Sequence, residues 1–137
     1  MRARVEAARV GRLATVDAQG TPHLVPVCFA LVGDAFTFAV DHKPKRATAL
    51  RRMANLAATG RASLLVDDYD EDWSRLWWVR LDGRGVVAEA SAAVDHVDAL
   101  VAKYPQYGPR RPAGPVAVVR VERWTGWSAS PVSPPAA

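Results

Sequence analysis

The sequence is poor in cysteine and histidine and has no long apolar run. Among its 137 residues are one cysteine, Cys28, and three histidines. A single cysteine excludes an internal disulfide, and His23, His42 and His96 are too far apart in sequence to form a metal-ligand motif. No apolar run approaches the roughly 18 residues of a membrane helix, and the N-terminus lacks the apolar core of a secretory signal. We therefore expect a cytoplasmic protein without a metal site or a membrane span.

The composition is otherwise that of an ordinary globular domain. Half of the residues are hydrophobic, 23% are charged, and the formal net charge is +4. This small positive excess permits an anionic ligand but does not by itself indicate nucleic-acid binding. We predict one domain over residues 1–128 and a loose C-terminal tail over residues 129–137, because no linker or internal repeat divides the chain.

The hydrophobic pattern is mostly of period two, which is typical of β-strands. It predicts strands at residues 12–16, 23–31, 36–40, 62–66, 75–88 and 116–124, and short helices at 2–9, 46–58 and 95–104. Because the strands mostly follow one another directly, the expected fold is mainly β, a six-stranded antiparallel β-barrel with short helices. Pro26 predicts a bulge or a sheet edge. Asp82-Gly83 fits either a hairpin turn or a bulge.

Basic residues cluster in one segment of the chain. Lys43, Lys45 and Arg46 lie where a predicted strand ends and a helix begins, and Arg51 and Arg52 follow on the helix. Free backbone N–H groups and the helix dipole make such a junction favourable for an anion. The alternative is a solvated helix face, which composition alone favours.

Tryptophan is abundant, with five residues in the chain. Trp77 and Trp78 are adjacent on a predicted strand, so one should face the core and the other should face outward. An outward tryptophan indicates a ligand wall or a subunit interface, and the alternative is a large core with a few exposed rings. Cys28 lies in an apolar predicted strand, where a thiol is normally inert, so no protein nucleophile is expected. The letters GRGVVA at residues 83–88 match a dinucleotide-binding fingerprint, but strand-like rather than helical sequence follows them.

Several motifs, taken in order, resemble the pyridoxamine 5′-phosphate oxidase-like split barrels. They are RLATVD and GTPHLVPV at residues 12–17 and 20–27, DHKPKR at 41–46, NL at 55–56 and RASLLVD at 61–67. The tracts DWSRLWWVR at 72–80 and YPQY at 104–107 are similar to the deazaflavin-dependent branch of that family. The resemblance covers about residues 5–128 and implies an FMN-binding split barrel that forms a homodimer, with two cofactor sites at the subunit interface.

The resemblance also implies roles for individual residues. It assigns the cofactor phosphate to Lys43, Lys45, Arg46 and Arg52. It places the ring system along Val25, Pro26, Val27 and Cys28 and along the segment from Phe38 to Val40. It assigns Trp77, Trp78 and Trp127 to the wall that the partner subunit contributes.

The implied activity is hydride transfer between the deazaflavin coenzyme F420 and a small organic acceptor, with the cofactor supplying the chemistry. One alternative is an FMN-binding oxidase or flavin reductase of the same fold. Another is a non-catalytic cofactor-binding protein. Nucleic-acid binding is disfavoured, because the basic residues are confined to one segment and are not interleaved with aromatic residues.

Overall fold

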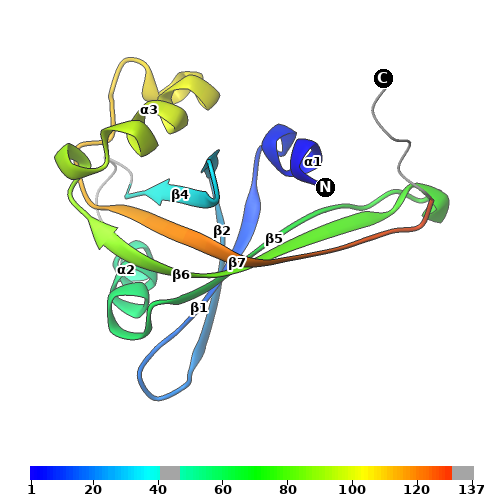
Figure 1. Cartoon of the computed structure of the whole chain (residues 1–137), viewed down its shortest axis with the longest axis horizontal. Coiled ribbons are helices and arrows are strands. Elements are labelled where there is room, and N and C mark those ends of the chain that lie inside the picture. Colours follow the sequence, from blue (N-terminus) through cyan, green and yellow to red (C-terminus); the bar gives the residue numbers. More distant parts are fainter. Residues whose placement is uncertain (41–46, 131–137) are drawn as a thin grey trace.

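A computed structural model of the chain describes residues 1–40 and 47–130. In these ranges seven strands form one antiparallel sheet that curves into a half-barrel, in the order β2-β1-β5-β6-β7-β4-β3 (Figure 1). The strands are β1 (Gly11–Val16), β2 (Pro22–Val27), β3 (Ala30–Val32), β4 (Ala35–Ala39), β5 (Arg61–Asp68), β6 (Trp77–Ala88) and β7 (Val116–Ser128). The helices are α1 (Arg2–Ala7), α2 (Ala47–Thr59) and α3 (Val94–Lys103), with short 3₁₀ turns η1 (Trp73–Arg75), η2 (Ala90–Ala92) and η3 (Pro105–Tyr107).

The mainly β, antiparallel class is confirmed, but the prediction of six strands is wrong. The strand expected over residues 23–31 is two strands, β2 and β3, which lie at opposite ends of the sheet. The break falls at Cys28 and Phe29, where the Phe29 N–H donates to the Tyr104 hydroxyl at 3.1 Å. The same hydroxyl lies 3.0 Å from the Phe29 carbonyl oxygen. The Tyr104 hydroxyl therefore binds both the N–H and the carbonyl group of Phe29. In a continuous strand these two groups would bind a neighbouring strand.

The turn predicted at residues 17–20 and the helix end predicted at residues 59–60 are both present. The Asp17 carboxylate accepts the N–H groups of Gln19 and Thr21, both at 2.9 Å, and so closes the turn between β1 and β2. Helix α2 ends at Gly60, whose φ of 70° is the left-handed conformation that favours glycine at a helix end.

The ambiguity at Asp82-Gly83 is resolved as a β-bulge inside β6. The pairing register of β6 with β7 shifts between these two residues, and β6 continues to Ala88. A Cβ atom placed on Gly83 would lie 2.2 Å from the Arg120 carbonyl oxygen of β7. Gly85 has a similar constraint, since a Cβ there would lie 2.7 Å from the Val118 carbonyl oxygen. The glycine spacing that matches a dinucleotide fingerprint is thus a requirement of strand packing.

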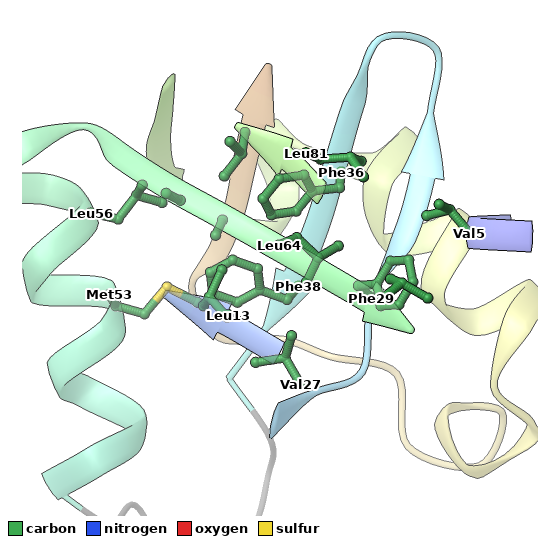
Figure 2. Packing of buried hydrophobic residues seen from close by; sticks show 14 of the residues in the cluster. Val5, Leu13, Val27, Phe29, Phe36, Phe38, Met53, Leu56, Leu64 and Leu81 are labelled. Carbon is green, nitrogen blue, oxygen red and sulfur yellow. The ribbon is translucent and has the colours of Figure 1, made fainter. Parts of the chain in front are cut away.

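The core lies on the concave side of the half-barrel. Phe36 and Phe38 from β4 pack with Leu13, Leu64 and Leu81 from the central strands (Figure 2). Met53 and Leu56 of α2 close one side of this cluster, and Phe29 and Val5 lie at the opposite side of the view (Figure 2). A second, smaller cluster holds α3 through Val97, Leu100 and Tyr104.

The far ends of the three longest strands extend beyond this core. In Figure 1 the ends of β5, β6 and β7 reach away from α2 and α3, and we call residues 67–78 and 126–130 the arm. Its two large aromatic residues outside the strands, Tyr69 and Trp73, are 64% and 69% exposed. The arm therefore presents an aromatic surface that no described part of the same chain covers.

Candidate functional site

The convex face of the sheet carries a groove of about 520 Å³, which we call the outer groove. It runs from the arm across the sheet to β2. The apolar side chains that line it are Leu24, Leu65, Tyr69, Leu76, Trp77, Trp78 and Trp127. Strand alternation explains its position, because core residues such as Leu64 and Val66 alternate along β5 with outward residues such as Leu65.

The two adjacent tryptophans lie on opposite faces of β6, as predicted, although both border the outer groove. Trp77 is half-buried against the core cluster, and the guanidinium carbon of Arg4 lies 4.9 Å from its ring centroid. Trp78 is directly opposite Trp127 in the β6–β7 ladder, so the two rings are on the same outer face. Trp127 is 49% exposed, and Leu24, at the other end of the groove, is 70% exposed. The groove is thus lined by apolar side chains that are open to solvent.

The cations along this groove already have carboxylate partners. Arg12 donates to Asp67 at 2.8 Å, and Arg80 donates to Asp82 at 3.1 Å. Asp82 also accepts the Ser63 hydroxyl at 2.6 Å. Because these charges are compensated, the outer groove suits a flat apolar surface better than a phosphate.

A further candidate cation, Arg52, lies on α2. Arg52 is half-buried, and its Nε is buried without a hydrogen-bond partner. Burial lowers the pKa of its guanidinium, while Tyr107 and Cys28 act in the opposite direction. Its neighbour Arg51 is exposed and acts electrostatically on Asp17 instead. Of these two consecutive arginines, Arg52 is therefore the one placed to bind an anion against the body of the protein.

The other predicted phosphate ligands, Lys43, Lys45 and Arg46, lie outside the described residues, so their role remains a prediction. The residues assigned to the ring system differ in how far their side chains are exposed. Val27, Phe38 and Val40 are buried in the core, so they could reach a cofactor only through backbone atoms. Val25 is half-buried and Pro26 is exposed.

Cys28 differs from the expectation of an inert core thiol. It is exposed and follows the last residue of β2. The strand pattern continued through this position in the sequence, but the strand ends at Val27 because Tyr104 holds the backbone of Phe29. Cys28 is thus available at the surface beside Tyr104, whose pKa is raised by burial and also by the nearby Cys28 thiol.

Sequence reasoning did not single out Lys103, the last residue of α3. Its Nζ lies 3.9 Å from the Phe29 ring centroid, is buried and has no hydrogen-bond partner. Its position at the end of an amphipathic helix was only a weak indication that its amine would be buried. A stronger one was its isolation, because the only other lysines of the chain are the two in the basic segment.

Comparison with known proteins decides the family. The model of the pyridoxamine 5′-phosphate oxidase family matches residues 1–128. The chain belongs to the pyridoxamine 5′-phosphate oxidase family. No curated protein sequence matches it significantly. The match spans nearly the whole chain, so it includes both the outer groove and the helix that carries Arg52.

Solved structures agree on the fold. A conserved hypothetical protein of Mycobacterium tuberculosis is 22% identical with a TM-score of 0.68, covering 93% of this chain and 81% of its own. A FAD-binding protein of Mesorhizobium loti is 21% identical with a TM-score of 0.66, covering 91% and 89%. HutZ, a heme storage protein of Vibrio cholerae, is 13% identical with a TM-score of 0.70, covering 93% and 90%. Pyridoxamine 5′-phosphate oxidase-like folds therefore occur in proteins that bind different cofactors.

Over residues 1–40 and 47–130, no helix is long and apolar enough to cross a membrane. In the same ranges, no group of three or more histidine, cysteine, aspartate or glutamate side chains is placed to hold a metal ion.

Proposed function

We propose that this protein is a cytoplasmic oxidoreductase that binds coenzyme F420 between two identical subunits and passes a hydride between it and a small organic acceptor. The observation that carries the proposal is the half-buried side chain of Arg52, whose Nε is buried without a hydrogen-bond partner, in a member of the pyridoxamine 5′-phosphate oxidase family. Burying a cation without a partner is costly, and an anionic group would remove that cost.

The described residues fit an anionic cofactor with a flat ring. Arg52 would bind the phosphate, together with Lys43, Lys45 and Arg46 from the preceding segment. The exposed side of β2 at Pro26 would lie along the ring, and Val25, which packs on the core, would reach the ring only through its backbone. The cofactor supplies the hydride chemistry when bound, and the protein binds its charges, orients its ring and excludes water. No side chain of this chain is assigned as a nucleophile.

The outer groove supports a dimer as the functional unit. Its apolar wall includes Leu24, Trp78 and Trp127, which are only partly covered within one chain. A second copy packed on this face would bury the wall and bring the aromatic residues of one arm next to the ring site of the other subunit. On this proposal Trp77, Trp78 and Trp127 bound the cofactor from across the interface.

Fluorescence titration with F420, and in parallel with FMN, tests the proposed function. We expect F420 to bind in the micromolar range or tighter and FMN to bind more weakly. Arg52→Met should weaken F420 binding roughly 10- to 100-fold, because a hydrogen bond to a charged group contributes about 1.5–3 kcal/mol. Arg51→Met is the matched control and should leave affinity unchanged. Equal effects of the two variants would refute the role of Arg52, and absence of F420 binding would refute the function.

A flavin-binding or non-catalytic protein is the second candidate. It is favoured by the structural similarity to proteins described as FAD-binding and heme storage proteins. Preference for FMN or FAD in the same titration would support a flavin enzyme. Tight cofactor binding without turnover of any acceptor would support a binding or storage protein.

A further inference from the structure

Three arginines lie side by side across the three longest strands of the sheet. In the pairing register Arg61 of β5 is opposite Arg84 of β6, and Arg84 is opposite Arg120 of β7. Directly opposed residues of antiparallel strands are on the same face, and all three arginines are exposed. We call these three residues the arginine row. Like charges in such positions destabilise a sheet, so an acidic partner would remove a cost that one chain alone retains.

The arginine row is on the face that carries the outer groove. Side chains alternate along a strand, and Arg61 is two residues from Ser63 on β5, while Arg84 is four residues from Arg80 on β6. Ser63 and Arg80 both line the groove. Within the described part of the chain, the one ion pair made by the row joins Arg84 to Glu122 at 3.7 Å. The row therefore keeps most of its positive charge next to an apolar groove.

The opposite charge is concentrated at the other end of the same strands. Residues 67–72, which we call the acidic tip, hold five carboxylates in six positions. Two of them are ion-paired, Asp67 with Arg12 and Asp70 with Arg75. Among the residues that the structure describes, the tip carboxylates without a cation within 4 Å are those of Asp68, Glu71 and Asp72. The acidic tip is part of the arm, which projects beyond the core in Figure 1 and is free to contact another molecule.

The acidic tip and the arginine row of one chain are held apart. Arg61 and Asp68 are the first and last residues of β5, so about 23 Å separates them at 3.3 Å per residue. Apolar groove residues such as Leu65 lie between them on the same strand. The face thus has positive charge at one end, negative charge at the other and apolar side chains between. Such a surface is complementary to a copy of itself turned end for end.

We propose that the arginine row binds the acidic tip of a second copy of this chain, and that the two copies are related by a two-fold axis that crosses the strands within the outer groove. An axis in this direction reverses the strands, so each tip meets the row of the other copy and the same contact forms twice. An axis along the strands would set tip against tip and row against row, and like charges across an interface disfavour association. The inference deepens the dimer of the proposed function and rests on it, but it does not depend on which cofactor binds.

A row of arginines also fits the phosphates of a nucleic acid. Two observations favour a second copy instead. The apolar groove beside the row needs an apolar partner, which a phosphate backbone does not supply. The net charge of the chain is only +4, and the acidic tip would repel a polyanion that followed the same face.

Charge reversal at the two ends of the face tests the arrangement. The row variant carries Arg61→Glu and Arg120→Glu, and the tip variant carries Asp68→Lys and Glu71→Lys. Sedimentation velocity over a range of protein concentrations gives the dissociation constant of the dimer. We expect each variant to raise this constant roughly tenfold or more, because unlike charges become like charges at both ends of the interface. The row variant places glutamates opposite Arg84 within the chain, so it should stay folded, which circular dichroism checks.

A chain that carries all four substitutions distinguishes this contact from a general effect of charge. Its row is acidic and its tip is basic, so the two attract again, and we expect the dissociation constant to return close to that of the parent. Arg51→Glu with Arg110→Glu is the matched control, because it changes the net charge as much as the row variant does, at exposed positions away from the groove. This control should leave the dissociation constant unchanged.

Unaltered dimerisation of the row variant or the tip variant, or no recovery in the chain with all four substitutions, would overturn the proposal. A row variant that keeps the dimer but loses binding of the parent protein to duplex DNA would overturn it in favour of a nucleic acid. F420 titration of the same samples separates this inference from the proposed function. A parent protein that dimerises and binds F420 while the row variant dimerises equally well refutes only the contact between tip and row. A parent protein that is monomeric at every concentration refutes the dimer as well.

Discussion

Substitution of Gly83 by alanine gives the sharpest test of the sheet geometry. Gly83 lies at the bulge of β6, where an added Cβ would be 2.2 Å from the Arg120 carbonyl oxygen and 2.9 Å from Val119 Cγ1. The nearest obstacle is backbone, so a side-chain rotation cannot relieve the contact. Strand β7 would have to move away from β6 at the point where its pairing register already shifts.

The magnitude follows from two costs. Inserting a carbon atom into a packed site costs about 1–3 kcal/mol, and each ladder hydrogen bond that β7 loses costs about 1 kcal/mol more. We therefore expect Gly83→Ala to lower the free energy of unfolding by roughly 2–4 kcal/mol. For a chain of this size that corresponds to a fall in Tm of about 6–15 °C.

Urea and thermal unfolding, followed by circular dichroism at a fixed protein concentration, would measure the change. Arg84→Ala is the matched control, because Arg84 is exposed and its nearest carboxylate, on Glu122, is 3.7 Å away. It should change stability by no more than about 0.5 kcal/mol. Alanine is normally better than glycine in a strand by roughly 0.5–1 kcal/mol. A neutral or stabilising Gly83→Ala would therefore refute the close approach of β7.

Three further predictions concern other parts of the molecule. Tyr104→Phe should lower the free energy of unfolding by about 1–3 kcal/mol in urea, because the buried Phe29 N–H loses its acceptor. Asp17→Asn should remove stability at neutral pH and make unfolding less sensitive to acid. The pKa of Asp17 is lowered by hydrogen bonds from Thr21 and Gln19, so its contribution is present above its unfolded pKa near 3.8 and is lost as pH falls through the folded value. Leu24→Glu should weaken the proposed dimer in sedimentation velocity, because it places a charge on the apolar wall of the outer groove.

Each of these predictions has its own control or contrary outcome. Tyr69→Phe, at an exposed tyrosine, should be nearly neutral, and equal losses at Tyr69 and Tyr104 would contradict the buried network. An Asp17→Asn variant with the acid sensitivity of the parent would contradict the role of that carboxylate. Val94→Glu introduces the same charge at an exposed valine away from the groove. If it dissociates the protein as readily as Leu24→Glu does, the groove is not the interface.

The parts of the fold that the sequence predicted depend on neighbouring residues. The turn at Asp17 and Gly20 and the end of α2 at Gly60 are set by side-chain caps and by glycine in a left-handed conformation, both visible locally. The opposite orientations of Trp77 and Trp78 likewise follow from strand alternation.

The parts that the sequence did not predict depend on distant residues. The break between β2 and β3 is made by the hydroxyl of Tyr104, 75 residues beyond Phe29. The bulge at Gly83 is fixed by the backbone of Arg120 on another strand. Lys103 was missed for the same reason, because only the fold brings Phe29 against its amine. No local pattern records such contacts.

The two ends of the sheet limit how the protein can aggregate. Strand β2 ends the sheet on one side and contains Pro22 and Pro26, which have no N–H to donate. The two prolines are four residues apart, so their nitrogens point to the same side, and the unbroken register with β1 requires that side to be the free one. The opposite end strand, β3, has only three residues. Neither end offers a long row of donors and acceptors to a strand from another molecule. The protein can therefore expose the apolar outer groove while the two end strands of its sheet resist the addition of strands from other molecules.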